Sequence, residues 1–258
     1  MQAVILAAGR GSRLGSMTNA VPKGMVQVAG KPILEWQRRA LLAGGAKAVT
    51  VVTGYRSKVI ADHGFDTIIN EDWSRGNMLS SLDRALRRFS GPLIVSYADI
   101  LYSPATVRDL IASDAPLSVA FDRDWLSLWQ RRFDDPLSDA ETFRLGVDGN
   151  IAEIGGKTNS ISDIEGQFMG LMKLGLEGRK WIEGLLAARP EARLAMDTTT
   201  MLSALISKGK LVRGIPATGG WCEIDDQVDW KVANELVAEG RLVLTDHGLE
   251  EGALRSYG

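Results

Sequence analysis

Two basic residues and a glycine-rich segment near the start of the chain could together hold a polyphosphate. An apolar run ends in Ala7-Ala8-Gly9-Arg10-Gly11-Ser12, and the basic residues Arg13 and Lys23 follow it. Small residues let backbone amides approach an anion without interference from a Cβ atom. Arg13 and Lys23 add two positive charges, as a bound triphosphate requires. The pattern predicts an enzyme that holds a nucleotide, with Lys23 and Arg13 as catalytic residues.

The glycine segment alone does not identify the nucleotide site. Gly9-x-Gly11 lacks the third glycine of the dinucleotide fingerprint, and the Gly-Lys-Ser/Thr of a P-loop is absent from it. An ordinary turn explains most isolated Gly-Arg-Gly triplets. Other residues must therefore support the prediction.

Acidic residues in two distant segments could hold a divalent cation. Asp99 follows a predicted buried strand, and open α/β sheets bind ligands at the carboxyl ends of their strands. Glu223 and Asp225 would share one face of a second strand. Carboxylates are the hard ligands that Mg²⁺ prefers, so we expect a magnesium site. The alternatives are a helix cap or a turn residue before Ser103-Pro104 for Asp99 and a solvated strand edge for the other two acids.

Asn77 and Ser81 form another candidate pair. They stand four residues apart on a helix that we expect to begin near Gly76, so both side chains point to one side. Such polar groups could recognise the edge of a nucleobase together with the Leu6–Ala8 backbone. Simple capping of the helix by Asn77 is the alternative.

The elements that position these residues alternate between strand and helix through Phe121, which predicts a doubly wound α/β half with a mainly parallel sheet. We expect strands at 2–7, 48–53, 67–70 and 92–97, and helices from Pro32 to Gly44, from Gly76 to Phe89 and from Ser103-Pro104 onward.

The pattern changes after Phe121. Residues 122–136 are charged and lack a clear period, and residues 142–154 predict a hairpin across Asp148-Gly149. Further elements are expected at 166–173 and 211–216 (strands) and at 176–188, 198–208 and 227–239 (helices). We predict one domain over 1–258, in which 1–121 mainly bind the nucleotide, 122–218 mainly bind an acceptor, and 219–258 supply metal ligands and a closing helix.

Composition excludes several classes of protein. The 258 residues are 45% apolar and 24% charged, which is typical of a globular domain. With 30 basic and 32 acidic residues, no overall field favours nucleic acid or an acidic membrane surface. Cys222 is the single cysteine, so an internal disulfide is excluded, and the histidines His63 and His247 are too few for a histidine-based zinc site. Without a signal or membrane segment, we expect a cytoplasmic protein, either a monomer or a homodimer.

The segment from Leu6 to Pro32 resembles the signature of the nucleoside-triphosphate transferase superfamily, which makes sugar nucleotides and CDP-alcohols. Its pattern is matched by Leu6 to Gly11, Arg13, Thr18, Pro22-Lys23 and Lys31-Pro32. Ala98-Asp99 is similar to the motif that carries the catalytic aspartate of that superfamily. Glu223-Ile224-Asp225 resembles the triplet that completes the metal site of bacterial phosphocholine cytidylyltransferases, and Asn70 to Asn77 with Ser81 resembles their pyrimidine-contacting stretch.

The resemblance implies a Rossmann-like doubly wound mixed sheet, the nucleotidyltransferase fold, with a smaller inserted acceptor-binding subdomain. It also implies that Asp99, Glu223 and Asp225 hold Mg²⁺, with Lys23, Arg13 and Asp99 as the catalytic residues. The expected nucleotide contacts are Leu6, Ala7, Ala8, Gly9, Arg10, Gly11, Ser12, Arg13, Lys23, Asn77, Ser81 and Ala98.

An acceptor site is expected from carboxylates and aromatic residues in the second half of the chain. The candidates are Arg123, Trp129, Asp139, Glu141 and Asp197. Carboxylates with an aromatic wall suit a cationic acceptor such as a choline or aminoethyl group. Capping of a helix is the alternative for Asp197. Threonines at 198–200 fit a primary amine or an amino acid at least as well as a quaternary ammonium.

These observations predict an enzyme: a Mg²⁺-dependent cytidylyltransferase that transfers CMP from CTP to a small phosphorylated or phosphonate amine and releases pyrophosphate. The acceptor would be phosphocholine-, aminoethylphosphonate- or phosphoglutamine-like. A sugar-1-phosphate nucleotidyltransferase is the alternative enzyme, and a non-catalytic nucleotide-sensing module is the alternative from another class.

Overall fold

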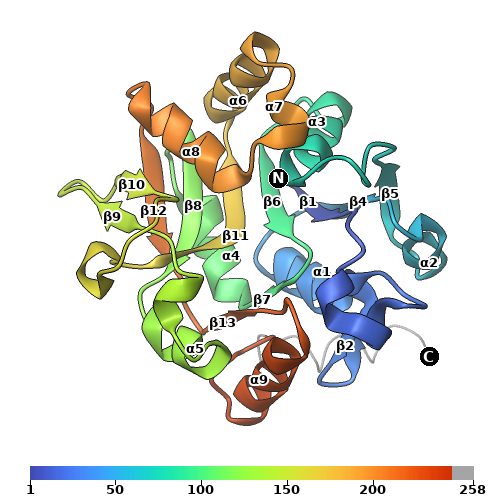
Figure 1. Cartoon of the computed structure of the whole chain (residues 1–258). Helices are drawn as coiled ribbons and strands as arrows, with labels where there is room; N and C mark the ends of the chain where they lie inside the picture. Colours follow the sequence, from blue (N-terminus) through green and yellow to red (C-terminus); the bar gives the residue numbers. More distant parts are fainter. Residues whose placement is uncertain (246–258) are drawn as a thin grey trace.

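A seven-stranded mixed sheet forms the centre of the computed structural model, which describes residues 1–245 (Figure 1). The strand order is β12-β8-β11-β6-β1-β4-β5. Strand β1 pairs in parallel with both β4 and β6, whereas β11 is antiparallel to both β6 and β8. The strands are β1 (Gln2–Ala7), β4 (Ala48–Thr53), β5 (Asp66–Ile69), β6 (Leu93–Tyr97), β8 (Leu117–Asp122), β11 (Gln167–Leu174) and β12 (Val212–Pro216). The predicted mixed α/β sheet is confirmed.

Helices cover both faces of this sheet because its buried strands send successive side chains to opposite sides. Ala3 and Ile5 of β1 join a core with α1, α4, α5 and α9, and Val4 and Leu6 join a second core with α3, α6 and α8. The helices are α1 (Ile33–Ala43), α2 (Ser57–Asp62), α3 (Met78–Arg88), α4 (Pro104–Ala112), α5 (Trp125–Arg132), α6 (Leu176–Ala188), α7 (Ala192–Ala195), α8 (Thr198–Ser207) and α9 (Gln227–Ala238). Within residues 1–245, none of the helices combines the length and the apolar character needed to cross a bilayer.

Small two-stranded sheets complete the fold: β2 (Gln27–Val28) with β3 (Lys31–Pro32), β7 (Ile100–Tyr102) with β13 (Trp221–Glu223), and β9 (Phe143–Leu145) with β10 (Ile151–Ile154). The last pair confirms the hairpin predicted across Asp148-Gly149. In the β7–β13 pair, Glu223 lies opposite Ile100, and the backbone N–H of Ile224 donates to the carbonyl of Asp99 at 2.8 Å. This pairing carries the C-terminal acids to the end of β6.

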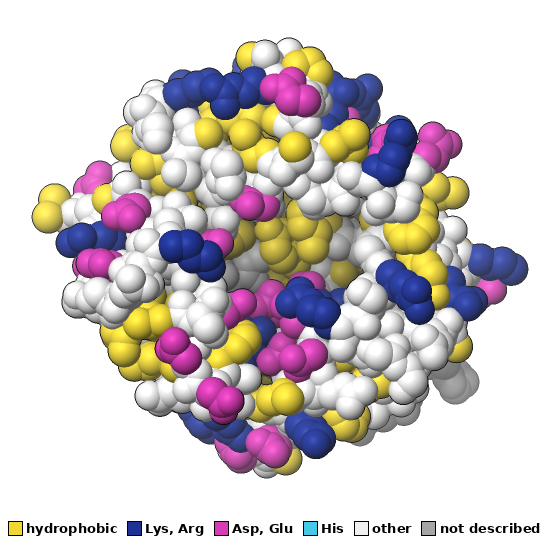
Figure 2. Space-filling model, viewed as in Figure 1, with side chains coloured by type: hydrophobic (Ala, Val, Ile, Leu, Met, Phe, Trp, Pro, Cys, Tyr) yellow, Lys and Arg dark blue, Asp and Glu magenta, His cyan; other side chains and the backbone are white. Residues whose placement is uncertain are grey.

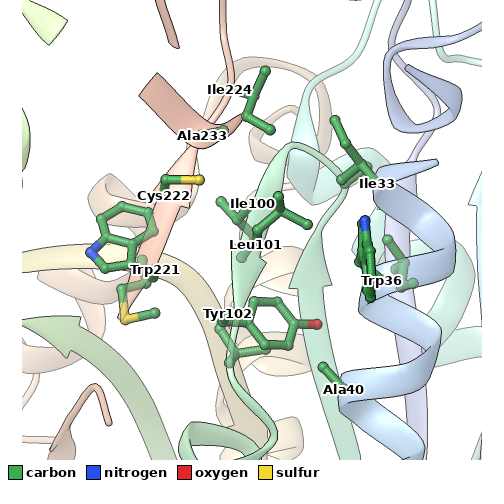
Figure 3. Close-up of a cluster of buried hydrophobic side chains, with 14 of the residues drawn as sticks. Ile33, Trp36, Ala40, Ile100, Leu101, Tyr102, Trp221, Cys222, Ile224 and Ala233 are labelled. Carbon is green, nitrogen blue, oxygen red and sulfur yellow. The ribbon is translucent and has the colours of Figure 1, made fainter. Parts of the chain in front are cut away.

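The β7–β13 pair is anchored in the core. Figure 3 shows Leu101 and Tyr102 of β7 between Trp221 and Cys222 of β13 on one side and Trp36 of α1 on the other, all in one core. Cys222 is a buried free thiol. The position of the C-terminal acids is therefore fixed by apolar packing on either side of them.

The prediction of irregular structure over 122–136 is wrong, because α5 occupies much of it. Trp125, Leu128, Trp129 and Arg132 are the buried residues of this helix and have helical spacing. The pattern was hidden in the sequence because one of the four buried positions is an arginine. The part of the predicted C-terminal segment beyond residue 245, with His247, lies outside the described residues.

Gln37 of α1 holds the loop that carries Asp99 through hydrogen bonds to its backbone. Its side chain is 1% exposed, and its Nε2 donates to the carbonyls of Tyr97 at 2.7 Å and Ile100 at 2.6 Å. One amide group thus donates to the carbonyls on either side of Asp99, and the carbonyl of Ile100 is the buried one of the two.

Replacing Gln37 with leucine should destabilise the chain, because a buried carbonyl without a donor costs about 1–3 kcal/mol. We expect the free energy of unfolding, measured by urea denaturation, to fall by roughly that amount. Arg39→Gln on the exposed side of the same helix is the control and should change it by less than about 0.5 kcal/mol. Equal stability of Gln37→Leu and wild type would contradict this account.

Candidate active site

Three carboxylates from distant parts of the chain converge at the carboxyl end of β6. Asp99 follows β6, Glu223 ends β13 and Asp225 lies just beyond it. One oxygen from each of the three lies within 4.8 Å of the others. Opposite oxygens around a Mg²⁺ ion are about 4.2 Å apart, so this donor set fits such an ion with only small side-chain movements.

The prediction that Glu223 and Asp225 share the face of one strand is wrong in its detail. Strand β13 ends at Glu223, since the N–H of Asp225 donates to the side chain of Asp229 at 2.8 Å instead of continuing the ladder. The two acids still meet, because the chain turns towards α9. Ser103, and not Asp99, caps α4 by accepting from the N–H of Thr106. The capping alternative for Asp99 is therefore excluded, whereas the residue does lie in a turn.

Lys23 and Arg13 approach these acids from the N-terminal segment. The Nζ atom of Lys23 lies 2.8 Å from Oδ2 of Asp99 and 2.5 Å from Oδ1 of Asp225. Arg13 Nη2 lies 2.9 Å from the same Asp225 oxygen. Although burial disfavours the charged ammonium, its attraction to Asp99 and Asp225 is stronger and raises the pKa of Lys23 above its ordinary value. The lysine is thus a fixed cation between two of the three acids.

Gly11 lets the Lys23 side chain reach this position. Its φ angle is +73°, in the left-handed region, and a Cβ atom there would lie 2.5 to 2.9 Å from Cβ, Cγ and Cδ of Lys23. No side chain fits at this separation, and the backbone conformation itself favours glycine. The glycine motif therefore shapes a passage for the lysine.

The electrostatics of the three acids differ. Burial in the cleft raises the pKa of Glu223 to about 8, and the negative charges of Asp225 and Asp99 add to the rise. Burial alone would raise the pKa of Asp225 as well, but Lys23 and Arg13 outweigh it and hold that pKa below its ordinary value. Of Glu223 and Asp225, Glu223 therefore takes up a proton first.

One cavity adjoins the glycine segment and collects part of the predicted nucleotide contacts. Its volume is about 250 Å³, and it is lined by Ala8, Gly9, Asn70, Trp73, Gly76, Asn77, Met78 and Ser81. Asn77 caps α3 by accepting from the N–H of Leu79 at 3.0 Å, as the alternative predicted, yet it also lines this cavity. Of the remaining predicted contacts, Leu6 and Ala7 are buried, and Arg10 and Ser12 are exposed, with the Arg10 guanidinium over the ring of Tyr55.

A second cavity of about 300 Å³ opens beside the acids. Its walls are formed by Arg13, Tyr97, Trp129, Asp139, Glu141, Gln167, Phe168, Met169, Gly170, Asp197, Thr198, Thr199, Trp221, Glu223 and Asp225. Figure 2 shows a hollow in the middle of the molecule with acidic side chains beside it and apolar groups at its back. Trp129, Asp139, Glu141 and Asp197 of the predicted acceptor set thus come together. Arg123 is not among the lining residues and lies exposed over the ring of Phe121.

Two of these cavity acids have features that bear on their role. Asp197 caps α8, accepting from the N–H of Thr200 at 2.7 Å, so the capping alternative is correct although the residue also lines the cavity. Burial raises the pKa of Glu141, and the nearby Asp197 and Asp139 contribute to the rise. A positive charge in the cavity would relieve this concentration of negative charge.

Sequence reasoning missed Arg132 and Asp229, which contact the acids from α5 and α9. Arg132 pairs with both Glu223 and Asp229, and Asp229 accepts from the N–H of Asp225. The available signal was the spacing of Asp225 and Asp229, four residues apart at the start of a predicted helix. Gln37, which holds the Asp99 loop, was also missed.

Comparisons with known proteins identify relatives of this chain in sequence and in fold. Residues 3–140 match the family described as "MobA-like NTP transferase domain". The chain is 34% identical to the CTP:phosphoglutamine cytidylyltransferase of Campylobacter jejuni, over 91% of this chain and 100% of that protein. It shares the fold of the inositol-1-phosphate CTP transferase of T. maritima (TM-score 0.71, 22% identity, 93% of this chain and 96% of that one). It also shares the fold of the CTP:phosphocholine cytidylyltransferase of Streptococcus pneumoniae (TM-score 0.68, 21% identity, 92% and 98%).

Removing the charge of Lys23 should strengthen binding of a divalent ion to the nucleotide-free protein. The ammonium contacts oxygens of Asp99 and Asp225 that an ion would use, so lysine and ion compete. We expect Lys23→Met to bind Mn²⁺ about tenfold more tightly, a change of roughly 1.4 kcal/mol. Electron paramagnetic resonance of free Mn²⁺ measures this. Lys31→Gln, at a lysine over the ring of Trp36, is the control and should not differ from wild type.

Metal affinity should rise with pH between about 6 and 8, because the proton held by Glu223 must leave before its carboxylate can bind an ion. The increase in metal affinity approaches about tenfold per pH unit at pH values well below the Glu223 pKa of about 8. Calorimetry in buffers of different ionisation enthalpy should detect the released proton. Glu223→Gln should bind more weakly and lose the pH dependence; if it kept the wild-type dependence, another group would be responsible.

Proposed function

The chain belongs to the family of MobA-like NTP transferase domains, and on that premise we propose that it is a Mg²⁺-dependent cytidylyltransferase. It would transfer CMP from CTP to a small phosphorylated or phosphonate amine and release pyrophosphate. The resemblance to nucleoside-triphosphate transferases drawn from the sequence is confirmed. The observation that carries the proposal is the meeting of Lys23, Arg13 and three carboxylates beside a cavity.

In the proposed reaction, an oxygen of the acceptor's phosphate or phosphonate attacks the α-phosphorus of CTP. A new P–O bond forms while the bond to the bridging oxygen breaks, and pyrophosphate leaves with the electron pair. No covalent enzyme intermediate is required, so the residues act by positioning the substrates and stabilising charge. Arg13 and the amides of Gly9 to Ser12 would hold the β- and γ-phosphates. Lys23 would neutralise charge that develops at the α-phosphate.

Asp99, Glu223 and Asp225 would hold the magnesium ion, which lowers the negative charge on phosphate oxygens. Their charge is balanced by Lys23, Arg13 and Arg132 in the free protein. Because a triphosphate attracts Lys23 and Arg13, its arrival would free the Asp225 oxygen that both residues contact. Lys23 and Arg13 would thus balance the charge of the acids in the free protein and the charge of the triphosphate in the substrate complex.

The cavity at Asn77 and Ser81 is proposed to hold the cytosine base. It lies at the end of β1, where the Ala8 and Gly9 backbone could approach the base edge. Ser81 is held by the amide of Asn70 at 3.1 Å, so its hydroxyl proton remains available as a donor. The volume of this cavity, about 250 Å³, is sufficient for a pyrimidine base.

The cavity with Asp139, Glu141 and Asp197 is proposed to hold a cationic acceptor. A primary ammonium fits it well, because its N–H donors can be shared among carboxylates. Trp129 offers little to a quaternary ammonium, since its ring is already covered by the Arg132 guanidinium at 4.9 Å. A reducing compartment such as the cytoplasm suits a chain whose one cysteine is a buried free thiol.

A pyrophosphate-release assay tests the proposal. CTP, UTP, GTP and dTTP are each combined with aminoethylphosphonate, phosphoethanolamine, phosphocholine, phosphoglutamine or glucose 1-phosphate. We expect turnover with CTP and a phosphorylated or phosphonate amine, and a loss of at least about 10²-fold in Lys23→Met and Asp99→Asn. The surface variant Asp62→Asn, which breaks only the exposed pair with Lys58, should keep full activity.

Three outcomes count against this function. Turnover only with glucose 1-phosphate would identify a sugar nucleotidyltransferase, and nucleotide binding without any turnover would identify a sensing module. Wild-type turnover in Lys23→Met or Asp99→Asn would show that the chemistry lies elsewhere.

A further inference from the structure

A buried ion pair lies directly behind the acidic cluster. Arg132, at the end of α5, contacts Asp229 of α9 through two separate bonds, Nε to Oδ1 at 2.8 Å and Nη2 to Oδ2 at 3.1 Å. The two side chains are 1% and 4% exposed. Removing one partner of such a pair leaves an uncompensated buried charge, which is strongly destabilising, whereas apolar residues of similar volume would pack as well. The pair therefore calls for an explanation beyond stability.

Each partner of this pair also touches one C-terminal acid. Arg132 Nη2 lies 3.1 Å from Oε2 of Glu223, and Oδ2 of Asp229 accepts from the backbone N–H of Asp225 at 2.8 Å. One contact fixes the side chain of Glu223, and the other fixes the backbone of Asp225. Both acids are thus held in place by the same buried ion pair, Arg132 with Asp229.

The plane of the Arg132 guanidinium is itself fixed. It lies 4.9 Å from the ring centres of both Trp129 and Phe133. A planar guanidinium can serve two carboxylates at fixed angles, which a lysine ammonium on a flexible stem does not do. Without this contact, repulsion from Asp99 and Asp225 would favour rotation of Glu223 away from them.

We propose that Arg132 and Asp229 are positioning residues that hold Glu223 and Asp225 at the spacing required to bind a divalent ion. This inference rests on the proposed function in taking the three acids as a metal site. Groups that orient metal ligands from behind typically change metal affinity by about 10–100-fold when replaced.

The surface of the same two helices supplies a matched control. Arg131, the neighbour of Arg132 on α5, contacts Glu235 at 2.7 Å and Glu239 at 2.9 Å on α9. It joins α5 to α9 as Arg132 does, but contacts none of the three acids among the described residues. Arg131→Lys thus tests the effect of weakening the contact between α5 and α9. Arg132→Lys tests, in addition, the effect of losing the contact with Glu223.

The experiment measures Mn²⁺ binding to the nucleotide-free full-length chain by electron paramagnetic resonance, with thermal unfolding recorded for every variant. Arg132→Lys keeps the charge but loses the planar fork, and we expect its affinity for Mn²⁺ to fall by at least about tenfold. The Mn²⁺ affinity of Asp229→Asn should fall likewise. Of the two carboxylates that Arg132 contacts in the wild-type chain, Glu223 then remains, and the arginine competes with the ion for that carboxylate. Arg131→Lys should match wild type. In turnover, the concentration of Mg²⁺ for half-maximal rate should rise in Arg132→Lys more than the maximal rate falls.

Wild-type Mn²⁺ affinity in a folded Arg132→Lys would overturn the proposal, and so would an equal loss in Arg131→Lys. If Arg132→Lys does not fold, the Mn²⁺ affinity of Asp229→Asn is compared with those of wild type and Arg131→Lys instead, and the same outcomes apply. A wild-type chain that binds no Mn²⁺ would overturn the metal site itself, a result distinct from failure of the cytidylyltransferase assay with its candidate acceptors.

Discussion

The structure depends on one buried interaction, the contact of the Lys23 ammonium with Asp99 and Asp225. It joins three segments that are 76 and 202 residues apart along the chain. Three carboxylates this close together repel one another, and Lys23, Arg13 and Arg132 offset that repulsion. Two of these three cations, Lys23 and Arg13, are the residues proposed to bind the triphosphate.

The surrounding architecture serves to bring these groups within reach. The parallel strands β1 and β6 end side by side, so the glycine segment and the Asp99 loop begin at the same edge of the sheet. Gln37 fixes the Asp99 loop from α1, and the pairing of β7 with β13 returns the chain to the same place more than a hundred residues later. Gly11 leaves the space through which the lysine reaches the acids.

Much of this could be predicted from local sequence, because the apolar strands, the glycine segment and the acids after strand ends are short-range patterns. The helix α5 could not be, since its buried face includes Arg132, whose partners Glu223 and Asp229 lie far away in sequence. Asn77 and Asp197 show a second limit. Capping and cavity lining were treated as alternatives, whereas the structure gives each residue both roles, because the start of a helix can also form a cavity wall.

The position of β13 has a consequence for how the cluster of acids is assembled. The stretch that matches the shared family description, residues 3–140, contains Lys23, the glycine segment and Asp99, whereas Glu223 and Asp225 come from outside it. A fragment that ended near residue 140 would therefore carry one of the three acids. The cluster is complete once β13 has paired with β7, so the folding of the second half of the chain decides whether the three carboxylates meet.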